Sequence, residues 1–578
     1  MVQLSKREFR AAALAEALTL DLFKALCDPS RLAVLAELAA CKPPRTVGRI
    51  DLRTLTGGHP MDHTRPEGYA FDEYLGGLGE NWFDEDELLL RWLARSRIDG
   101  TTLEWLRGFG RTVATRYREW ADVVERREKL PAIADRGPYN RPSAEVVLPL
   151  ETRKMLAEVH GSGLWKTALD ERARYALIYL LNQNGESGIA CSVACTDGLA
   201  RALRVLGDDA RSREVTEQLE TATPEHWVHG AQFVTEIQGG SDAATNALLA
   251  EPATASRPFG ASSEDALWSL TGQKWFCSNL TADYWLVTAR VQGGRADHRG
   301  IGLFCVPRLH DGVPNGYRIL RLKDKLGTRA VPTAELELEG ALGWPIGPLD
   351  AGLKNTVAIV LTVSRIHNVV AAAGMSRRAS REAHAYAGFR RAFGRRIAEH
   401  PLLAASLREI SETADRTEAA AFATLDAWLT ALAHSHDHDR ALWARVIVSI
   451  AKAMLTRRGP GHIYNAMMVL GGNGTEERFS ALPRLWRDAA ILETWEGPYT
   501  LLLMQALGDL VKFGVKGRER SFLELGLGDH LGADDARELA DVLNDPGREE
   551  NVLRWGELAP RLFGRFEERA LQALRAGE

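Results

Sequence analysis

The hydrophobic period of this chain changes twice, and this change restricts the possible folds more than any other feature. From about residue 70 to 228, apolar residues recur at helical spacing, as in DEDELLLRWLARS and RYALIYLLNQ. From about residue 229 the period is two, in short runs such as WLVTARV and TAELELEG that are rich in β-branched and aromatic residues. After Pro348 the helical period returns. The order helices, sheet, helices predicts an α+β protein, mainly α, with an antiparallel sheet in the middle.

Long segments without proline follow the predicted sheet. No proline occurs between Pro348 and Pro401, so residues 353–398 can hold one or two long helices. Two more helical stretches, 402–433 and 441–458, indicate an antiparallel four-helix bundle. The predicted segments are an N-terminal helical extension (1–56), an N-terminal α domain (57–228), a β domain (229–350), a C-terminal four-helix bundle (351–510) and a C-terminal helical extension (511–578).

The charge and composition exclude some classes of function. The 578 residues include 77 acidic and 72 basic ones, which gives no global electrostatic case for nucleic acid or membrane binding. Arg365 and His367 interrupt the most apolar stretch, AIVLTVSRIHNVVAAAG, so we expect no membrane span. The N-terminus is charged too early for a secretory signal, and six scattered cysteines show no metal-ligand pattern. We therefore expect a cytoplasmic protein.

A lone carboxylate, Glu496, lies between Trp495 and a Gly-Pro turn in the apolar stretch RDAAILETWEGPYTLLLMQAL. Burial of an ionised carboxylate without a partner costs several kcal/mol. Glu496 is therefore expected either to face solvent or to be retained for its basicity.

Two motifs of the predicted sheet domain have residues suited to a flat, anionic ligand. In FVTEIQGGSDAATNA, small residues such as Gly240 and Ser241 let backbone N–H groups approach an anion. Thr235 in this motif and Ser278 in GQKWFCSN could hydrogen-bond the edge of a heterocycle. Taken alone, each motif also fits an ordinary turn, and Phe276 fits a core aromatic.

With three further blocks, these motifs resemble the acyl-CoA dehydrogenase family. The blocks between residues 229 and 500 are, in order, FVTEIQGGSD, GQKWFCSN, KDKLGTRAVPTAELEL, FRRAFGRRI and MVLGGNGTEERFSALPRLWRDAAILETWEG. The resemblance implies a flavoprotein built of a helical domain, a β domain and a four-helix bundle. The long N-terminal domain, the KWFCS wording and the extra C-terminal segment are most similar to the branch that includes the alkylation-response protein AidB.

The resemblance implies FAD as the cofactor and assigns residues to it. Thr235 and Ser241, with Gly240 between them, match residues that hold the flavin pyrimidine edge and the pyrophosphate. Phe276 and Ser278 match the pair that covers the isoalloxazine ring and hydrogen-bonds near N5.

A second group of residues is implied to act across a subunit interface. Arg390 and Phe393, in RRAFG, match an arginine and a phenylalanine that reach the FAD of a neighbouring subunit. Gly471 and Gly472 match residues that line the adenosine side of a partner's flavin. A homodimer or homotetramer is therefore expected.

Glu496 matches the family's catalytic base, which removes the α-proton of an acyl-CoA while the β-hydride passes to flavin N5. Exclusion of water by Trp495 would raise the pKa of this base. Some relatives place the base one residue before an arginine, but here Ser364 precedes Arg365, so no second carboxylate competes. Arg365 is then either a structural cation or a cation that orients the substrate. The expected partners are an acyl-CoA or other acyl thioester and an electron-transfer flavoprotein or similar acceptor.

The chain departs from the family pattern at two places. Pro498, Tyr499 and Thr500 follow the Glu-Gly pair where polar residues that touch the flavin are common. Met468 stands where a glutamine before LGG is common. Both changes remove hydrogen bonds to FAD or its adenosine half.

Two other clusters have a plainer interpretation beside a chemical one. His434, His436 and His438 could bind a divalent metal, but they fall in a polar turn between two predicted helices, so no metal is predicted. Cys191 and Cys195 are one helical turn apart and could share a metal or oxidise, or simply pack between helices.

Nucleic-acid binding stays open as an alternative. Residues 20–56 weakly resemble the start of an ArsR-type winged helix, in ALCDPSRL, but the roughly forty residues needed for a recognition helix and wing do not follow. Residues 506–578 contain 11 basic and 15 acidic residues, which argues against phosphate binding there. The predicted function is a FAD-dependent acyl-CoA dehydrogenase. The alternatives are an AidB-like, DNA-associated flavin-binding protein with low turnover and a flavin monooxygenase on the same scaffold.

Overall fold

The computed structural model describes residues 71–134, 136, 138–140, 145–253 and 267–577. The chain divides into two units, 1–67 and 68–578, and all described residues belong to the second. The predicted extension at 1–56, its ArsR-like stretch at 20–56 and the boundary at residue 57 lie outside the described residues.

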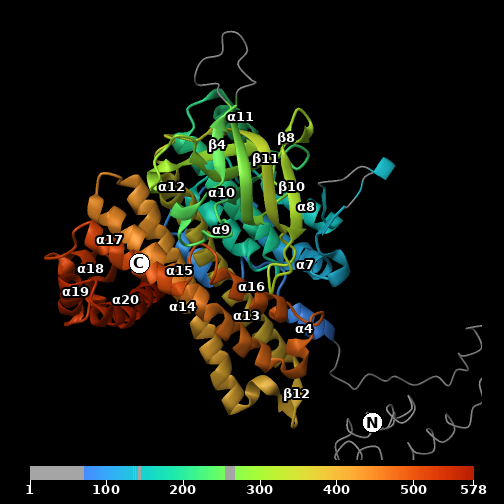
Figure 1. Cartoon of the computed structure of the whole chain (residues 1–578). Coiled ribbons are helices and arrows are strands. Elements are labelled where there is room, and N and C mark those ends of the chain that lie inside the picture. The colour runs from blue at the N-terminus through green and yellow to red at the C-terminus, as the bar shows by residue number, and fades with distance from the viewer. Residues whose placement is uncertain (1–70, 135, 137, 141–144, 254–266, 578) are drawn as a thin grey trace, which may run out of the picture. The chain divides into compact units, whose positions relative to one another are not determined.

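Helices form the first part of the described chain (blue to green in Figure 1). They are α4 (Phe71–Gly77), α5 (Glu87–Leu93), α6 (Gly100–Thr112), α7 (Arg118–Val124), α8 (Leu150–His160), α9 (Glu171–Leu181), α10 (Gly188–Leu206) and α11 (Ala210–Glu220). Asp86, Asp99, Asp170 and Asp209 each accept a backbone N–H in the first turn of α5, α6, α9 and α11, which sets where these helices begin. Most of α10 is buried, because it packs against both the sheet and the bundle.

A seven-stranded sheet follows, as the change of period predicts. Its strands are β3 (Gly230–Phe233), β4 (Leu249–Pro252), β5 (Trp268–Ser278), β6 (Tyr284–Val291), β7 (Ile301–Pro307), β10 (Tyr317–Leu322) and β11 (Thr333–Pro345). Three antiparallel strand pairs are not part of this sheet: β1 (Ala132–Ile133) with β2 (Val146–Val147), β8 (Leu309–His310) with β9 (Val313–Pro314), and β12 (Arg391–Ala392) with β13 (Arg395–Arg396).

The sheet is mixed, so the prediction of a purely antiparallel sheet is wrong in this detail. Both β3 and β4 run parallel to β6, while β4 is antiparallel to β5. Alternation of side chains is the same in both kinds of pairing, so the sequence pattern could not separate them. The segment between β3 and β4 leaves the sheet and carries the FVTEIQGGSD motif.

The C-terminal bundle (yellow to orange in Figure 1) consists mainly of long helices. Its members are α12 (Gly352–Asn355), the π-helical stretch η7 (Thr356–Leu361), α13 (Thr362–Phe389), α14 (Pro401–Ala433), α15 (His438–Val469), α16 (Leu482–Leu492) and α17 (Tyr499–Lys512). The prediction that the third helical stretch ends at residue 458 is wrong, because α15 continues through Pro460. Ile463, Ala466 and Met467 lie beyond that proline, and their burial in the bundle core keeps the helix going.

One helical run, Gly352–Phe389, is long and apolar enough to cross a membrane by length and composition. Of its most apolar window, 72% is buried inside the protein. From the sequence we expected Arg365 and His367 to exclude a membrane span, but the run meets the length and composition criteria despite them. Its burial is that of a core helix.

The last helices pack against the bundle. They are α18 (Glu519–Leu527), α19 (Asp535–Asn544) and α20 (Glu549–Ala576), drawn in red in Figure 1. The indole N–H of Trp555 in α20 donates to the carbonyl oxygen of Leu503 in α17 at 2.7 Å. Arg458 in α15 forms an ion pair with the buried Glu567 of α20. The segment from residue 511 therefore shares its core with the bundle.

We expect Gly526→Ala to test this packing. A Cβ at residue 526 would overlap the indole ring of Trp443 in α15, which is buried. Overpacking of this kind lowers the free energy of unfolding by about 1–3 kcal/mol or more. Gly508→Ala in α17 is the control, since nothing lies within 4 Å of its Cβ, and it should be neutral or slightly stabilising. Equal urea midpoints for the two variants would contradict the packing of α18 on α15.

Candidate active site

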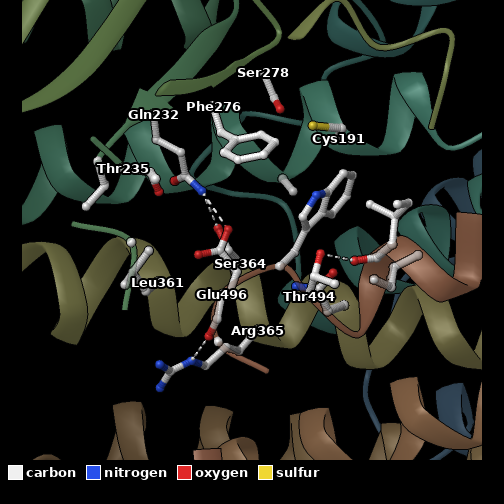
Figure 2. Close-up of a pocket in the computed structure, with 18 of the residues that line it drawn as sticks. Cys191, Gln232, Thr235, Phe276, Ser278, Leu361, Ser364, Arg365, Thr494 and Glu496 are labelled. Carbon is white, nitrogen blue, oxygen red and sulfur yellow. Dashed lines mark hydrogen bonds between the residues drawn. The ribbon is translucent and has the colours of Figure 1, made fainter. Parts of the chain in front are cut away.

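A cavity of about 1170 Å³ lies among α10, the sheet, α13 and the segment that leads into α17. Figure 2 shows ten of its lining residues by name. It brings together residues that are far apart in the sequence. The predicted site residues that line it are Thr235, Gly240, Ser241, Phe276, Ser278, Arg365, Trp495 and Glu496.

The other four predicted residues do not line this cavity. Arg390 directly follows α13, and Phe393 lies in the turn between β12 and β13 with 96% of its surface exposed. Gly471 and Gly472 follow α15 after one intervening residue, Leu470, and are exposed. Their predicted contact with the flavin of a partner subunit stays a prediction.

Glu496 adopts a backbone conformation that is unusual for a residue with a side chain. Its φ is +55°, in the left-handed region, within the loop between α16 and α17. Such a conformation costs of order 1–3 kcal/mol and persists only where the surroundings hold it. Gly497 follows with φ +105°, which glycine adopts without penalty. The Glu-Gly pair thus makes a sharp turn that presents the glutamate to the cavity.

Two buried cations hold this turn through its backbone. Nε of Arg365, from α13, donates to the carbonyl oxygen of Glu496 at 3.1 Å (Figure 2). Nζ of Lys452, from α15, donates to the carbonyl oxygens of Glu493 at 2.9 Å and Gly497 at 2.7 Å. Lys452 is fully buried and Arg365 nearly so. The bundle therefore determines the position of the loop.

The carboxylate of Glu496 is oriented by an amide from the sheet. Nε2 of Gln232, in β3, donates to Oε1 of Glu496 at 3.1 Å and to Oγ of Ser364 at 2.9 Å. Figure 2 shows Gln232 and Glu496 pointing toward one another across the cavity wall. The second carboxylate oxygen, Oε2, is left for other contacts within the cavity.

The charged groups around the cavity shift one another's pKa. Burial raises the pKa of Glu496 above its ordinary value, although the charges of Arg365 and Lys452 and the hydrogen bond from Gln232 oppose the shift. Burial lowers the pKa of Lys452 to about 7 and that of Arg365 to about 10, with the negative charge of Glu496 opposing both shifts. A carboxylate with a raised pKa is a stronger base than an exposed one.

The loop after β3 is held by a buried ion pair. Glu236 accepts from Nζ of Lys274, in β5, at 2.8 Å. This pair anchors the segment that places Thr235, Gly240 and Ser241 along the cavity. The atom nearest to a Cβ built on Gly240 is 3.8 Å away, so the backbone there is open to a ligand.

An aromatic face and a hydroxyl pair form the adjoining wall. Phe276, in β5, keeps 50% of its surface exposed, and Nζ of Lys323 lies 4.4 Å from its ring centroid. Oγ of Ser278 is 3.0 Å from Oγ1 of Thr333. A half-exposed aromatic ring at a cavity offers a flat surface on which a planar ligand can stack.

In the structure, the two cysteines pack against other side chains, and the histidine-rich turn supplies a helix cap. Cys191 and Cys195 are reduced, buried and line the cavity, where Trp495 and Val331 pack against them. The described residues contain no group of three or more His, Cys, Asp or Glu side chains that could hold a metal. Asp437, from the histidine-rich turn, caps α15 by accepting the backbone N–H of Arg440.

Sequence reasoning missed two residues of the site, Gln232 and Lys452. Lys452 stands alone in the apolar helical run VIVSIAKAML, and a single charge at a position facing the core is a signal for a buried partner. Gln232 in the short strand GAQF had no comparable signal, because a polar residue in a half-buried strand is ordinary.

Comparison with known proteins agrees with this fold. Residues 231–341 match the family model of the acyl-CoA dehydrogenase middle domain, and residues 350–507 match that of the acyl-CoA dehydrogenase C-terminal domain. These two regions of the chain are therefore domains of the acyl-CoA dehydrogenase family.

Individual relatives place the chain near AidB, as the sequence predicts. It is 30% identical to the Escherichia coli protein AidB over 365 residues, which are 60% of this chain and 63% of AidB. Among solved structures, the apo form of Bd2924 is 29% identical with a TM-score of 0.76, covering 86% of this chain and 98% of that one. Caenorhabditis elegans ACDH-11 in complex with C11-CoA has the same fold at 22% identity, with a TM-score of 0.73 and coverage of 86% and 88%. The chain spans between 51% and 63% of the length of the first curated relatives it matches.

Proposed function

We propose that this chain is a FAD-dependent acyl-CoA dehydrogenase in which Glu496 is the base. The observation that carries the proposal is the turn at Glu496. The backbone of Glu496 is left-handed, and its carboxylate, which has a raised pKa, lies at the cavity. Residues from three separate elements hold it there. Strained residues held in this way are concentrated at functional sites.

The residues at the cavity fit a flavin. Gly240 leaves its backbone open to an anionic group, and Thr235 and Ser241 carry hydroxyls beside it. Phe276 offers a flat face against which the ring system can lie. When bound, FAD would supply the acceptor for the hydride. Ser278 would hydrogen-bond the ring near N5.

A second subunit would complete the cofactor site. Arg390, Phe393, Gly471 and Gly472 would contact the FAD of a partner, and the exposed position of Phe393 suits such a contact. The proposed assembly is therefore at least a homodimer. An electron-transfer flavoprotein or similar acceptor would take up the electrons.

The chain's own residues would move the proton. Glu496 accepts the α-proton of the acyl thioester at its carboxylate, and loss of the β-hydride then leaves an α,β double bond. The positive charges of Arg365 and Lys452 act on Glu496 and favour the ionised carboxylate that accepts the proton. Trp495, packed on Val331 and the two cysteines, would keep water from the reacting carbons. The acyl-CoA substrate is supported by the family and by the C11-CoA bound to ACDH-11.

The proposal is tested by anaerobic titration of the purified flavoprotein with a panel of acyl-CoAs. We expect the visible flavin absorbance to bleach with at least one chain class. Bound flavin that no acyl-CoA bleaches would contradict the proposed dehydrogenase.

We expect Gln232→Leu to move the pH dependence of flavin reduction. The hydrogen bond from Gln232 stabilises the ionised form of Glu496, so its loss raises the pKa of Glu496 further. Because the base must be ionised to accept a proton, the pH of half-maximal reduction rate should rise by about one unit. Rapid-reaction absorbance measurements across pH provide the test. Gln292→Leu, an exposed glutamine outside the cavity, should leave the profile unchanged, and a profile unmoved in both variants would refute the role of Gln232.

No contact seen in the C-terminal helices favours DNA binding. In the described chain, Arg561, Arg565 and Arg575 each form ion pairs with carboxylates of neighbouring helices. Cations already neutralised in this way contribute little to phosphate binding. A monooxygenase on this scaffold would have no use for the carboxylate of Glu496.

A further inference from the structure

The cavity continues along α13 beyond the loop that carries Glu496. Ser364, Asn368 and Ala371 lie at helical spacing on one face of α13, and all three line the cavity. Ser364 lies beside Glu496, because both accept from the same amide of Gln232. At the rise of an α-helix, Asn368 is about 6 Å and Ala371 about 10 Å further along the helix axis. The cavity therefore extends about two helical turns past the proposed base.

The helix α10 forms the facing wall of this extension. A Cβ built on Gly198 of α10 would lie 3.2 Å from Cγ1 of Val360, shortly before α13 begins. A Cβ built on Gly374 of α13 would lie 2.9 Å from Cβ of Asn182, which precedes α10. The two helices therefore run past one another in opposite directions. We call the part of the cavity between them the inner arm, and its lining residues are Ala190, Cys191, Ala194, Asn368 and Ala371.

Asn368 brings an unpaired amide into the inner arm. Only 5% of its surface is exposed, and no hydrogen bond joins its side chain to another of the described residues. Both Oδ1 and Nδ2 nevertheless keep some accessible surface, unlike the enclosed Oδ1 of Asn182. Since Asn368 lines the cavity, a molecule within the inner arm can reach both atoms. Buried polar atoms are nearly always paired, so this amide is suited to a partner that enters the cavity.

The amide of Asn368 suits a neutral oxygen group at one distance from the base. A side-chain amide is uncharged and can both donate and accept a hydrogen bond, as can a hydroxyl. The ionised carboxylate of Glu496, which lies beside Ser364, disfavours a second negative charge nearby. The distance of about 6 Å from Ser364 to Asn368 corresponds to about five bonds of an extended carbon chain. With the α-carbon at Glu496, the matching hydroxyl lies near carbon 7 of the acyl chain, within about one carbon.

We propose that the inner arm selects acyl groups that carry a hydroxyl on about carbon 6 to 8 of the chain. The hydroxyl forms a hydrogen bond with the amide of Asn368. The small side chains of Ala190 and Ala194 leave room for the carbon chain around it. A plain acyl chain of the same length would bury that amide without a partner, which weakens its binding. This inference rests on the proposed acyl-CoA dehydrogenase function.

The test moves a hydroxyl along a chain of fixed length. A decanoyl chain spans the inner arm, since Ala371 lies about eight bonds past the α-carbon. Decanoyl-CoA is compared with hydroxydecanoyl-CoAs that carry the hydroxyl on successive carbons from about 4 to 9. Dissociation constants are measured from the perturbation of the flavin spectrum in the Glu496→Gln holoenzyme, in which we expect binding without reaction. Bleaching of the wild-type holoenzyme by the same compounds is followed anaerobically.

We expect the affinity to pass through a maximum when the hydroxyl is on about carbon 6 to 8. At the maximum, the hydroxydecanoyl-CoA should bind about tenfold more tightly than decanoyl-CoA, which is the effect of one net hydrogen bond. A general effect of polarity on binding would give no such dependence on position.

Variants assign the maximum to Asn368. Asn368→Leu, added to Glu496→Gln, should abolish the maximum and let decanoyl-CoA bind more tightly, because no polar group is then left unpaired. Asn368→Ser shortens the polar side chain and should weaken the maximum, and it serves if the leucine variant does not retain flavin. Asn544→Leu, which replaces an exposed asparagine at the end of α19, is the control and should keep the full preference.

The outcomes distinguish the two proposals. Equal binding of all the compounds, with bleaching of the wild type, would overturn the inner-arm proposal while supporting the dehydrogenase. A maximum without bleaching by any compound would support the inner arm and contradict the dehydrogenase. A maximum that persists in both Asn368 variants would overturn the assignment to this residue.

A dicarboxylic chain tests the choice of a neutral group. Lys325 also lines the cavity, and burial lowers the pKa of its ammonium group to about 8. Tighter binding of decanedioyl-CoA than of every hydroxydecanoyl-CoA would overturn the proposal and assign the selection to this cation. We expect decanedioyl-CoA to bind less tightly than the best hydroxydecanoyl-CoA.

Discussion

Glu496→Gln is expected to abolish bleaching of the flavin by substrate while leaving the flavin bound. The new amide has nearly the same shape as the carboxylate but no basicity, so the α-proton has no acceptor. General-base catalysis typically contributes 10²–10⁴ in rate, and we expect the rate of flavin reduction to fall by about that factor or more. The turn itself should survive, because Arg365 and Lys452 hold it through backbone carbonyl oxygens and not through the side chain.

The control for this substitution lies in the same loop. Glu493 is three residues earlier, and its carboxylate pairs with Arg457 and does not line the cavity. Glu493→Gln should therefore reduce flavin within a few-fold of the wild-type rate in anaerobic stopped-flow measurements. A Glu496→Gln variant that keeps wild-type reduction would remove Glu496 as the base, even with acyl-CoA bleaching established for the wild type.

Lys452→Met is expected to have the second largest effect. The thioether chain fills much of the same space but cannot donate to the carbonyl oxygens of Glu493 and Gly497. Two buried acceptors then lose their partner, which lowers the free energy of unfolding by about 1–3 kcal/mol each. The loop is free to move, and a displacement of about 1 Å at a base can lower the rate about 10²-fold. Loss of the nearby charge also raises the pKa of Glu496.

The two effects of Lys452→Met are measured separately. Urea unfolding gives the change in stability, and stopped-flow reduction of the flavin-loaded variant gives the change in rate. Lys512→Met, an exposed lysine in α17, is the matched control and should change neither quantity appreciably. A variant that is less stable but reduces flavin at the wild-type rate would show that Lys452 supports the fold and not the position of the base.

The burial of Lys452 should also change how the free energy of unfolding depends on pH. Burial lowers the pKa of Lys452 to about 7, well below its ordinary value. Between about pH 7 and 10, the unfolded chain binds this proton more readily than the folded one, so the contribution of Lys452 to stability rises with pH. Lys452→Met should lack this rise, which denaturant midpoints measured across that range would reveal. An identical slope in both proteins would show that Lys452 is not buried as described.

Much of the site could be predicted because it is encoded in short, contiguous motifs. Thr235, Gly240 and Ser241 occur within one loop, Phe276 and Ser278 lie two residues apart at the end of one strand, and their types limit what they can bind. Glu496 was recognisable because burial of an isolated carboxylate in an apolar stretch costs free energy, which makes a functional role worth considering. In the structure these residues line one cavity together with Arg365 and Trp495.

The partners of these residues could not be predicted in the same way. Gln232 meets Glu496 from 264 positions away, and Lys452 reaches Gly497 from the neighbouring helix α15. No local sequence pattern predicts such pairings, because they depend on how whole helices and strands pack against one another. The parallel pairing of β3 with β6 and the passage of α15 through Pro460 were missed for a related reason, since neighbouring elements and core packing override local preference.

By itself the sequence determined the order of helices and sheet, the family and the carboxylate on which the proposed chemistry depends. These follow from hydrophobic period and from residue types in contiguous motifs, which act over a few residues. Only the tertiary structure decided that Glu496 would be left-handed and that two buried cations would hold the backbone of its loop. The physical reason is that burial and hydrogen-bond geometry are properties of elements packed together, and no single segment contains them.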